Sequence, residues 1–191
     1  MNTQTLLSIV ADQREELLAN DYSELCPRPE ESQLDLKSNR AQVVIGVRRC
    51  GKSTLCEMFL KQKGIDFAYV NFDDDRMEDM KASDLDHLLE ALYMTYGEFK
   101  YLFLDEIQNI EGWPLFVNRL LRQKMHLFIT GSNSKLLSKE LSTHLTGRNN
   151  KVELYPFSYS EYCAMKNIDT TSLSTKAKGI RKSTLHEYLL Q

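Results

Sequence analysis

The feature that most constrains this chain is a glycine-rich turn between an apolar run and an amphipathic segment. Residues 43–45 form a short apolar run that is typical of a buried strand. Gly46 follows, then four variable residues, then Gly51, Lys52 and Ser53. The next segment carries apolar residues at the spacing of one helix face. Those apolar positions are Leu55, Met58 and Phe59.

The order of strand, turn and helix, with this glycine spacing, predicts a phosphate-binding loop. Glycine allows backbone angles that are closed to other residues and lets the chain approach an anion closely. The loop N–H groups and the positive end of the following helix would then face phosphate oxygens. Lys52 is expected to reach the β- and γ-phosphates, and the Ser53 hydroxyl to bind Mg²⁺. The alternative is a glycine-rich turn with a chance lysine. The expected nucleotide contacts are Gly46, Val47, Arg48, Arg49, Cys50, Gly51, Lys52, Ser53 and Thr54.

A second motif is an acidic pair at the end of the apolar run at residues 100–104. Downstream of a phosphate loop, Asp105 is expected to bind Mg²⁺ directly or through a bound water, together with Ser53. Glu106 would act as the general base for the water that attacks the γ-phosphate. Buried carboxylates are costly unless they are paired or metal-bound, which favours this interpretation. The alternative is a helix N-terminus, where acidic residues are also favourable.

A group of small polar residues follows another strand, expected at residues 126–130. Ser132 or Asn133 could hydrogen-bond the γ-phosphate or the attacking water, and so report which nucleotide is bound. Ser134 could instead simply cap a helix expected at residues 135–145.

Arg148, after that helix, is the candidate cation that offsets charge on the transferring phosphoryl group. It could act in its own subunit or in a neighbouring one. The alternative is a charge that stabilises a helix C-terminus.

Three further positions each allow two interpretations. Residues 73–75 are consecutive aspartates after a strand expected at residues 65–72, so they form either a solvated loop or part of the ligand crevice. Arg28 lies between two prolines and is either a solvated loop charge or a nucleotide contact. Cys50 is either a tolerated small residue or an oxidation-sensitive thiol.

Composition excludes several classes of protein. The chain has 191 residues, 42% of them hydrophobic, and a net charge of −3, so no basic field points to nucleic acid or membrane. Its four cysteines are scattered, which disfavours a disulfide framework or a zinc site and favours a reducing compartment. No apolar run approaches the ~20 residues of a membrane span, and the first residues lack the cationic and apolar regions typical of a signal peptide. We therefore expect a cytoplasmic protein without a membrane partner.

Alternating strands and helices predict an α/β fold with a mostly parallel sheet and helices on both faces. Residues 1–40 are expected to form a helix (residues 1–20) and a connecting loop, with a short helix at residues 31–38. Residues 41–166 would form the P-loop core. Residues 167–191 would form a flexible polar linker, up to about residue 182, and the start of a C-terminal region.

Four stretches together resemble a known family: GVRRCGKS, YLFLDEIQNI, LFITGSNSKLLS and LTGRNNKVELYPFSYSEY. They are similar to the bacterial and archaeal AAA-type P-loop ATPases that carry an appended C-terminal domain of unknown function. The resemblance covers nearly the whole chain. It implies a five-stranded, mainly parallel sheet of order 5-1-4-3-2. It also implies that the strand-4 tip lies between the phosphate loop and the acidic pair.

The resemblance also implies roles for individual residues. It makes Ser132 or Asn133 the nucleotide sensor and Arg148 the arginine finger. It implies ATP and Mg²⁺ as ligands, and a homo-oligomer is one arrangement to test. The ATP and magnesium residues that it implies are Lys52, Ser53, Asp105 and Glu106.

The chain departs from the family at its end, because family members continue for a comparable length past a segment like LHEYLLQ. It therefore looks like a truncated ATPase half, and the missing C-terminal domain is an expected partner. The sequence does not identify a protein or nucleic-acid partner.

Three functions remain open. They are ATP hydrolysis, nucleotide binding without turnover, and a small P-loop kinase. Glu106 disfavours the kinase, which needs no base to activate water. The absence of an N-K-x-D base-recognition motif from the sequence disfavours a GTPase.

Overall fold

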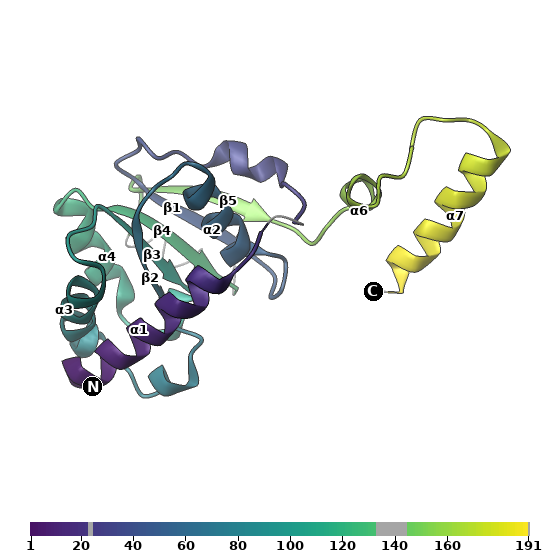
Figure 1. Cartoon of the computed structure of the whole chain (residues 1–191). Helices are drawn as coiled ribbons and strands as arrows, with labels where there is room; N and C mark the ends of the chain where they lie inside the picture. Colours follow the sequence, from purple (N-terminus) through teal and green to yellow (C-terminus); the bar gives the residue numbers. More distant parts are fainter. Residues whose placement is uncertain (23–24, 133–144, 191) are drawn as a thin grey trace.

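The fold is built on one sheet of five parallel strands. The computed structural model describes residues 1–22, 25–132 and 145–190. Within them the strand order is β2-β3-β4-β1-β5, which is the expected order 5-1-4-3-2 seen from the other edge (Figure 1). The strands are β1 (Ala41–Gly46), β2 (Phe67–Asn71), β3 (Tyr101–Asp105), β4 (His126–Gly131) and β5 (Asn149–Leu154).

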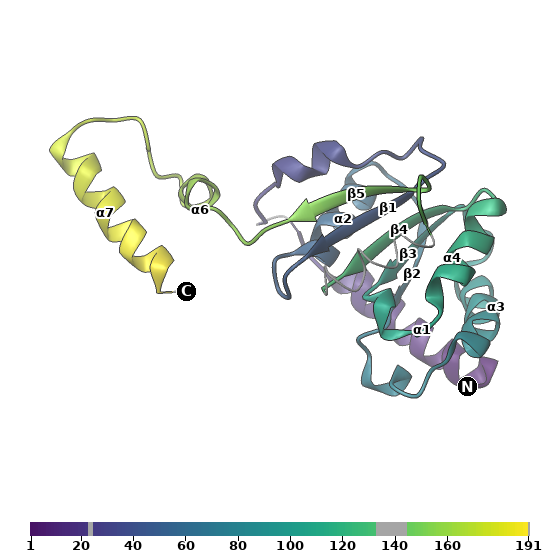
Figure 2. The same ribbon diagram turned by 180° about the vertical axis from the view of Figure 1, so that it is seen from behind.

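Helices cover both faces of this sheet, as expected. The α-helices are α1 (Thr3–Ala19), α2 (Lys52–Gln62), α3 (Leu85–Tyr96), α4 (Trp113–Arg122), α6 (Tyr159–Met165) and α7 (Thr175–Leu189). Short 3₁₀ helices are η1 (Pro29–Gln33), η2 (Asp75–Met77), η3 (Ala82–Asp84) and η4 (Ile107–Asn109). Figure 2 shows the same arrangement from behind.

Alternate residues of a strand pack into two separate hydrophobic cores, because successive side chains of a strand point to opposite faces of the sheet. On β1, Val43 and Ile45 pack with α1, α3 and α4, whereas Val44 packs with α2. On β3, Phe103 joins the α2 side. The apolar runs that predicted the strands therefore fill both cores.

The sheet register brings the strand ends together at one edge. Asn71 of β2 lies opposite Asp105 of β3, and Ile45 of β1 lies opposite Gly131 of β4. All the pairings within the sheet are parallel, so the residues that follow β1, β3 and β4 emerge side by side. This edge is where a ligand binds in an open α/β sheet.

The α1 helix covers the β2 edge of the sheet. The carboxamide of Gln13 donates to the Asn71 carbonyl and accepts from the Asn71 N–H, both at 3.0 Å. It thereby satisfies backbone groups that an edge strand would otherwise leave unpaired. No helix among the described residues is both long and apolar enough to cross a membrane.

Two local expectations were wrong. The helix expected at residues 31–38 is only the 3₁₀ turn η1, which begins at Pro29. The expected flexible segment up to residue 182 is partly helical, because α7 begins at Thr175. Ser174 caps that helix by accepting from the Ala177 N–H at 3.2 Å. The polar composition of the segment had suggested a linker, although a polar residue can also start a helix in this way.

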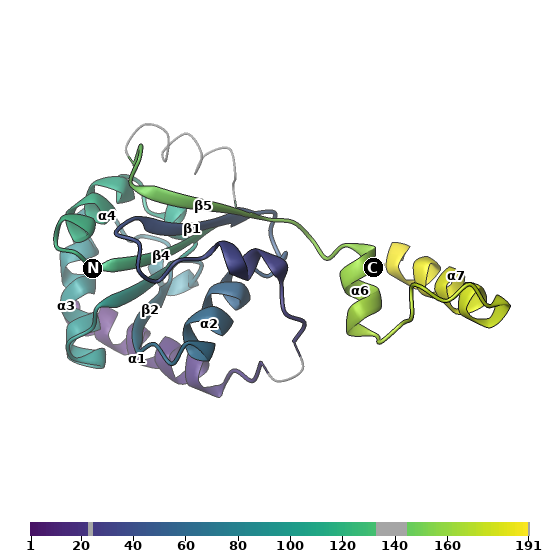
Figure 3. The ribbon, with the colours of Figure 1, turned by 90° about the horizontal axis from the view of Figure 1, so that it is seen from above.

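The last two helices form an arm, which we define as α6 and α7. Figure 3 shows the arm to one side of the sheet, beyond the end of β5. Within it, the ring of Tyr188 on α7 lies 5.6 Å from that of Tyr159 and 5.5 Å from that of Tyr162, both on α6. Lys166 also forms an ion pair with Glu187.

Asp74 is a structural member of the acidic segment after β2. Its carboxylate accepts from the side chain and main chain of Arg76 and from Gln13 at 2.9 Å. These hydrogen bonds, chiefly those from Arg76, lower the pKa of Asp74 to about 2. They are worth most when the carboxylate is charged.

We predict that Asp74→Asn lowers the free energy of unfolding by about 1 kcal/mol at pH 7, a value reduced by solvent screening. A carboxyl group whose pKa is lowered in the folded state stabilises the fold at pH values above its unfolded-state pKa. This stabilisation is lost as the pH falls through the folded-state pKa. The gap between wild type and variant should therefore close between about pH 4 and pH 2. Urea unfolding at several pH values measures this, and a gap independent of pH would contradict it.

Candidate functional site

The glycine-rich turn joins β1 to α2, and its two key glycines are needed for different reasons. Gly51 has φ = 92°, in the left-handed region that favours glycine. Gly46 is not in that region. A Cβ on Gly46 would lie 2.1 Å from the Leu154 carbonyl oxygen of β5 and 2.8 Å from Cys50 Sγ. The expected need for special backbone angles therefore holds for Gly51, whereas Gly46 lets β5 pack closely.

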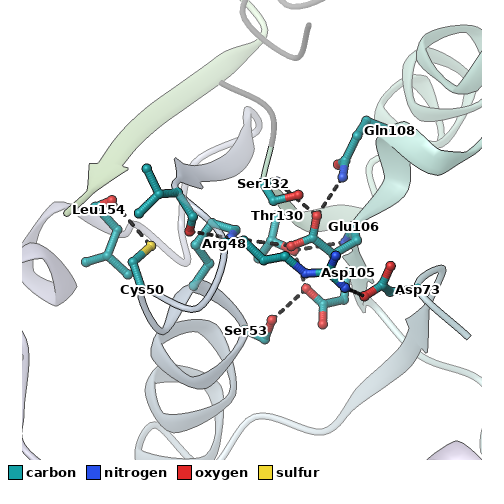
Figure 4. A network of polar contacts seen from close by, with 12 residues as sticks. Arg48, Cys50, Ser53, Asp73, Asp105, Glu106, Gln108, Thr130, Ser132 and Leu154 are labelled. Atoms are coloured by element: carbon teal, nitrogen blue, oxygen red, sulfur yellow. Dashed lines mark hydrogen bonds and ion pairs between the residues drawn. The ribbon is translucent and has the colours of Figure 1, made fainter. Parts of the chain in front are cut away.

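Cys50 is a buried packing residue of this turn. Its Sγ donates to the Leu154 carbonyl at 3.4 Å (Figure 4). Burial raises the pKa of the Cys50 thiol, so the reactive thiolate is disfavoured. The structure therefore favours the tolerated small residue over the oxidation-sensitive thiol.

Lys52 opens α2 and is 4% exposed. Its Nζ donates to the Val47 carbonyl at 3.1 Å and lies 3.4 Å from Glu106 Oε1. The lysine of the turn and the acid that follows β3 thus converge, although they are far apart in the chain.

Asp105 ends β3 and is almost fully buried. Its Oδ1 accepts from Ser53 Oγ at 2.8 Å and from Thr130 Oγ1, as Figure 4 shows. Tyr69 donates to Oδ2 at 3.4 Å. Burial raises the pKa of Asp105, and the hydrogen bonds from Thr130 and Ser53 oppose that rise.

Glu106 lies in the left-handed region at φ = 53° and ψ = 40°, which is uncommon for a residue with a side chain. Its N–H donates to Thr130 Oγ1 at 3.0 Å. Its Oε2 accepts from the Ser132 N–H at 2.9 Å and from Gln108 Nε2 (Figure 4). Burial alone would raise the pKa of Glu106. The hydrogen bonds from Gln108 and Ser132 and the charge of Lys52 hold it below its ordinary value.

Thr130, Gln108 and Tyr69 belong to this network but were missed by the sequence analysis. Thr130 and Tyr69 were taken only as parts of strands, and Gln108 only as part of the stretch YLFLDEIQNI. A hydroxyl at the C-terminal end of a buried strand, beside a phosphate-loop strand, is the clue that could have identified Thr130. Ser132 contributes its main-chain N–H, and Asn133 lies outside the described residues.

The acidic segment after β2 is only partly near the turn. Asp73 forms an exposed ion pair with Arg48 at 2.9 Å (Figure 4). Asp74 is engaged with Gln13 and Arg76. The structure thus gives Asp73 and Asp74 partners that are not the candidate magnesium residues.

Arg148 is not brought to the other candidates within this chain. It precedes β5, and its Nη1 donates to Asn118 of α4 at 3.0 Å. Because β5 is parallel to β1, the turn after β1 lies a strand length away, about 20 Å for six residues. Arg148 lines an open groove together with Arg119 and Arg122.

A small pocket of about 160 Å³ lies beside the turn, with Cys50 and Gly51 in its lining. Its walls are mostly apolar and include Cys50, Thr54, Met58 and Phe157. The pocket adjoins the start of α2, so a ligand with phosphate at the turn could place an apolar ring there.

The oxygen atoms at Ser53 and Asp105 fit a magnesium site. Mg²⁺ takes oxygen ligands, commonly one or two protein groups with phosphates and waters. Ser53 Oγ and Asp105 Oδ1 lie 2.8 Å apart and face one another. Among the described residues no cluster of three His, Cys, Asp or Glu side chains forms a metal cage.

The fold and the turn define an α/β protein of the P-loop NTPase class. Comparison with protein families then shows to which family of this class the chain belongs. The model of the AAA domain family matches residues 38–163, more than half of the chain. The chain therefore belongs to the AAA domain family of nucleotide-binding ATPases.

Two curated relatives are similar over most of the chain. An uncharacterised protein of Methanocaldococcus jannaschii is 39% identical over 158 residues, covering 82% of this chain and 35% of that protein. An uncharacterised protein of Haemophilus influenzae is 39% identical over 139 residues, covering 69% and 35%. The chain spans about a third of the length of both relatives.

A solved structure supports the fold alone. Domain III of the Thermotoga maritima replication initiation protein DnaA is similar with a TM-score of 0.52 and 14% identity. The similarity covers 76% of this chain and 71% of that chain.

We predict that Gly46→Ala lowers the free energy of unfolding by about 3 kcal/mol, because the new methyl group must displace the β5 backbone. Gly64→Ala is the matched control. Gly64 has φ = 64° and open space around it, so only backbone strain of about 1 kcal/mol is expected. Chemical denaturation of both variants measures the difference, and equal losses would contradict the close-packing role of Gly46.

Proposed function

We propose that this chain binds ATP with Mg²⁺ and hydrolyses it. One observation carries the proposal: the ammonium and hydroxyl groups at the start of α2 meet the two carboxylates at the end of β3. They meet where the C-terminal ends of the strands lie together. Lys52 Nζ lies 3.4 Å from Glu106, and Ser53 Oγ lies 2.8 Å from Asp105. A chance lysine in a glycine-rich turn would not require this convergence.

Residues 46–54 would bind the triphosphate. The main-chain N–H groups of the turn and of the first turn of α2 supply donors, and Lys52 supplies a charge. The pocket beside Thr54 would take the adenine ring. Ser53 and Asp105 would hold Mg²⁺, which when bound neutralises charge on the β- and γ-phosphates.

Glu106 would act as the general base. Its lowered pKa keeps it ionised at neutral pH, and Gln108 and the Ser132 N–H fix its second oxygen. Phosphate would compete with Glu106 for the Lys52 ammonium and so free Oε1 to accept a proton from water. The water oxygen then bonds to the γ-phosphorus as the bond to the bridging oxygen breaks, giving ADP and phosphate.

Nucleotide binding without turnover is the second candidate. The observation that favours it is the contact between Lys52 and Glu106, which keeps the candidate base occupied. A small kinase is disfavoured, since Glu106 is held charged where it would activate water.

We predict that the wild-type chain releases phosphate from Mg-ATP and that Glu106→Gln lowers turnover by at least about 100-fold, with ATP affinity nearly unchanged. Lys52→Ala should lose most of its ATP affinity. Calorimetry and a phosphate-release assay measure the two quantities.

The outcomes separate the alternatives. ATP binding without phosphate release by the wild type would favour the binding module. Phosphate release unaffected by Lys52→Ala would contradict both functions.

We further propose that Arg148 serves the site of a second copy. In its own chain it lies beside the start of β1, whereas the turn follows the end of β1. A head-to-tail contact would let one copy present Arg148 to the γ-phosphate of the next.

A mixing experiment tests this role. Glu106→Gln and Arg148→Ala should each hydrolyse ATP poorly. An equimolar mixture should regain a measurable fraction of wild-type turnover, because an intact site can then meet an intact arginine. A mixture no more active than its components would show that Arg148 does not act between copies.

A further inference from the structure

Arg28 is buried, with 8% of its surface exposed, so the interpretation as a solvated loop charge is wrong. Its Nη1 donates to the Cys50 carbonyl at 3.3 Å, and its Nη2 donates to the Tyr155 carbonyl at 2.7 Å. Its Nε lies 2.8 Å from Glu161 Oε1. The guanidinium carbon lies 4.5 Å from the centre of the Phe157 ring. One side chain thus joins the segment before η1, the phosphate loop and the start of the arm.

The contact with Cys50 reaches the anion-binding face of the loop. In a trans peptide, the C=O and the following N–H point in opposite directions on one rigid plane. The peptide that offers the Cys50 carbonyl to Arg28 therefore carries the Gly51 N–H on its other side. A phosphate that orients this N–H also orients the carbonyl that Arg28 grips.

The contact with Glu161 reaches the first turn of α6. The other carboxylate oxygen, Oε2, accepts from the Ser158 N–H at 2.8 Å and from Ser158 Oγ at 2.7 Å. Glu161 and Ser158 form the capping box that starts α6. Arg28 therefore holds the residue that fixes where α6 begins, and α6 in turn packs against α7.

We propose that Arg28 is a positioning residue that couples nucleotide binding at the phosphate loop to the placement of the arm. The coupling rests on the proposed function only in that the loop binds a nucleotide. Coupling of this kind is reciprocal. The factor by which bound nucleotide favours the contact between Arg28 and Glu161 therefore equals the factor by which that contact raises nucleotide affinity.

Glu161→Gln is the informative variant. Glutamine still serves in a capping box, but it removes the nearer of the two carboxylate charges that pair with Arg28. The other, Glu30, lies 3.6 Å from Arg28 Nε and is left in place. Glu187→Gln is the matched control, because it removes the Lys166–Glu187 ion pair of the arm without touching Arg28. Arg28→Lys is a second test, since an ammonium keeps the charge but cannot reproduce the planar fork to three acceptors.

The experiment uses Mg-ADP, which avoids turnover, and two measurements. Amide hydrogen exchange follows residues 159–165, and calorimetry gives Mg-ADP affinity. In wild type and Glu187→Gln, Mg-ADP should slow α6 exchange on the order of tenfold. In Glu161→Gln and Arg28→Lys this slowing should be lost, and Mg-ADP affinity should fall by the same factor.

A merely structural ion pair would not respond to nucleotide. Wild-type α6 exchange that ignores bound Mg-ADP would overturn the coupling, as would slowing that persists in both Arg28→Lys and Glu161→Gln. If Glu161→Gln fails to fold by circular dichroism, Arg28→Lys decides the outcome. Failure of wild type to bind Mg-ADP would instead refute the proposed nucleotide site, and the coupling with it.

Discussion

The candidate site depends on the hydrogen bonds that the buried carboxylate of Asp105 accepts. It ties the end of β3 to Ser53 at the start of α2 and to Thr130 at the end of β4. An ionised carboxylate in so buried a place is costly unless its oxygens are hydrogen-bonded. The parallel order of β3, β4 and β1 supplies those partners, because it brings all three strand ends to one edge. Loss of either hydroxyl would leave part of the charge uncompensated.

The same edge holds a strained residue, and strain of this kind is common at functional sites. Glu106 adopts a left-handed conformation beside Asp105, with its N–H fixed by Thr130. Its carboxylate then reaches Lys52, Gln108 and Ser132. The Thr130 hydroxyl therefore contacts both acidic residues. It donates to the Asp105 carboxylate and accepts from the Glu106 main-chain N–H. The site is a single network, so its members are not expected to contribute independently.

The sequence predicted the parts of this site that depend on local spacing. The glycine pattern, the acidic pair and the alternating apolar runs located the turn, the acids and the strands, and the family resemblance supplied the confirmed strand order. Contacts between distant segments could not be predicted in the same way. The need for Gly46 arises from the backbone of β5, and the burial of Arg28 arises from Tyr155 and Glu161. The separation of Arg148 from the turn likewise follows from the direction of β5 in the sheet.

We propose that the turn between β1 and α2 holds a nucleotide phosphate beside the acidic pair. A crystal structure of the chain with Mg-ADP tests this most directly. We expect the β-phosphate to accept from the Lys52 ammonium and the loop N–H groups, with Mg²⁺ at Ser53 Oγ and Lys52 drawn away from Glu106. Nucleotide bound elsewhere, with Lys52 still on the Val47 carbonyl and Glu106, would contradict the account.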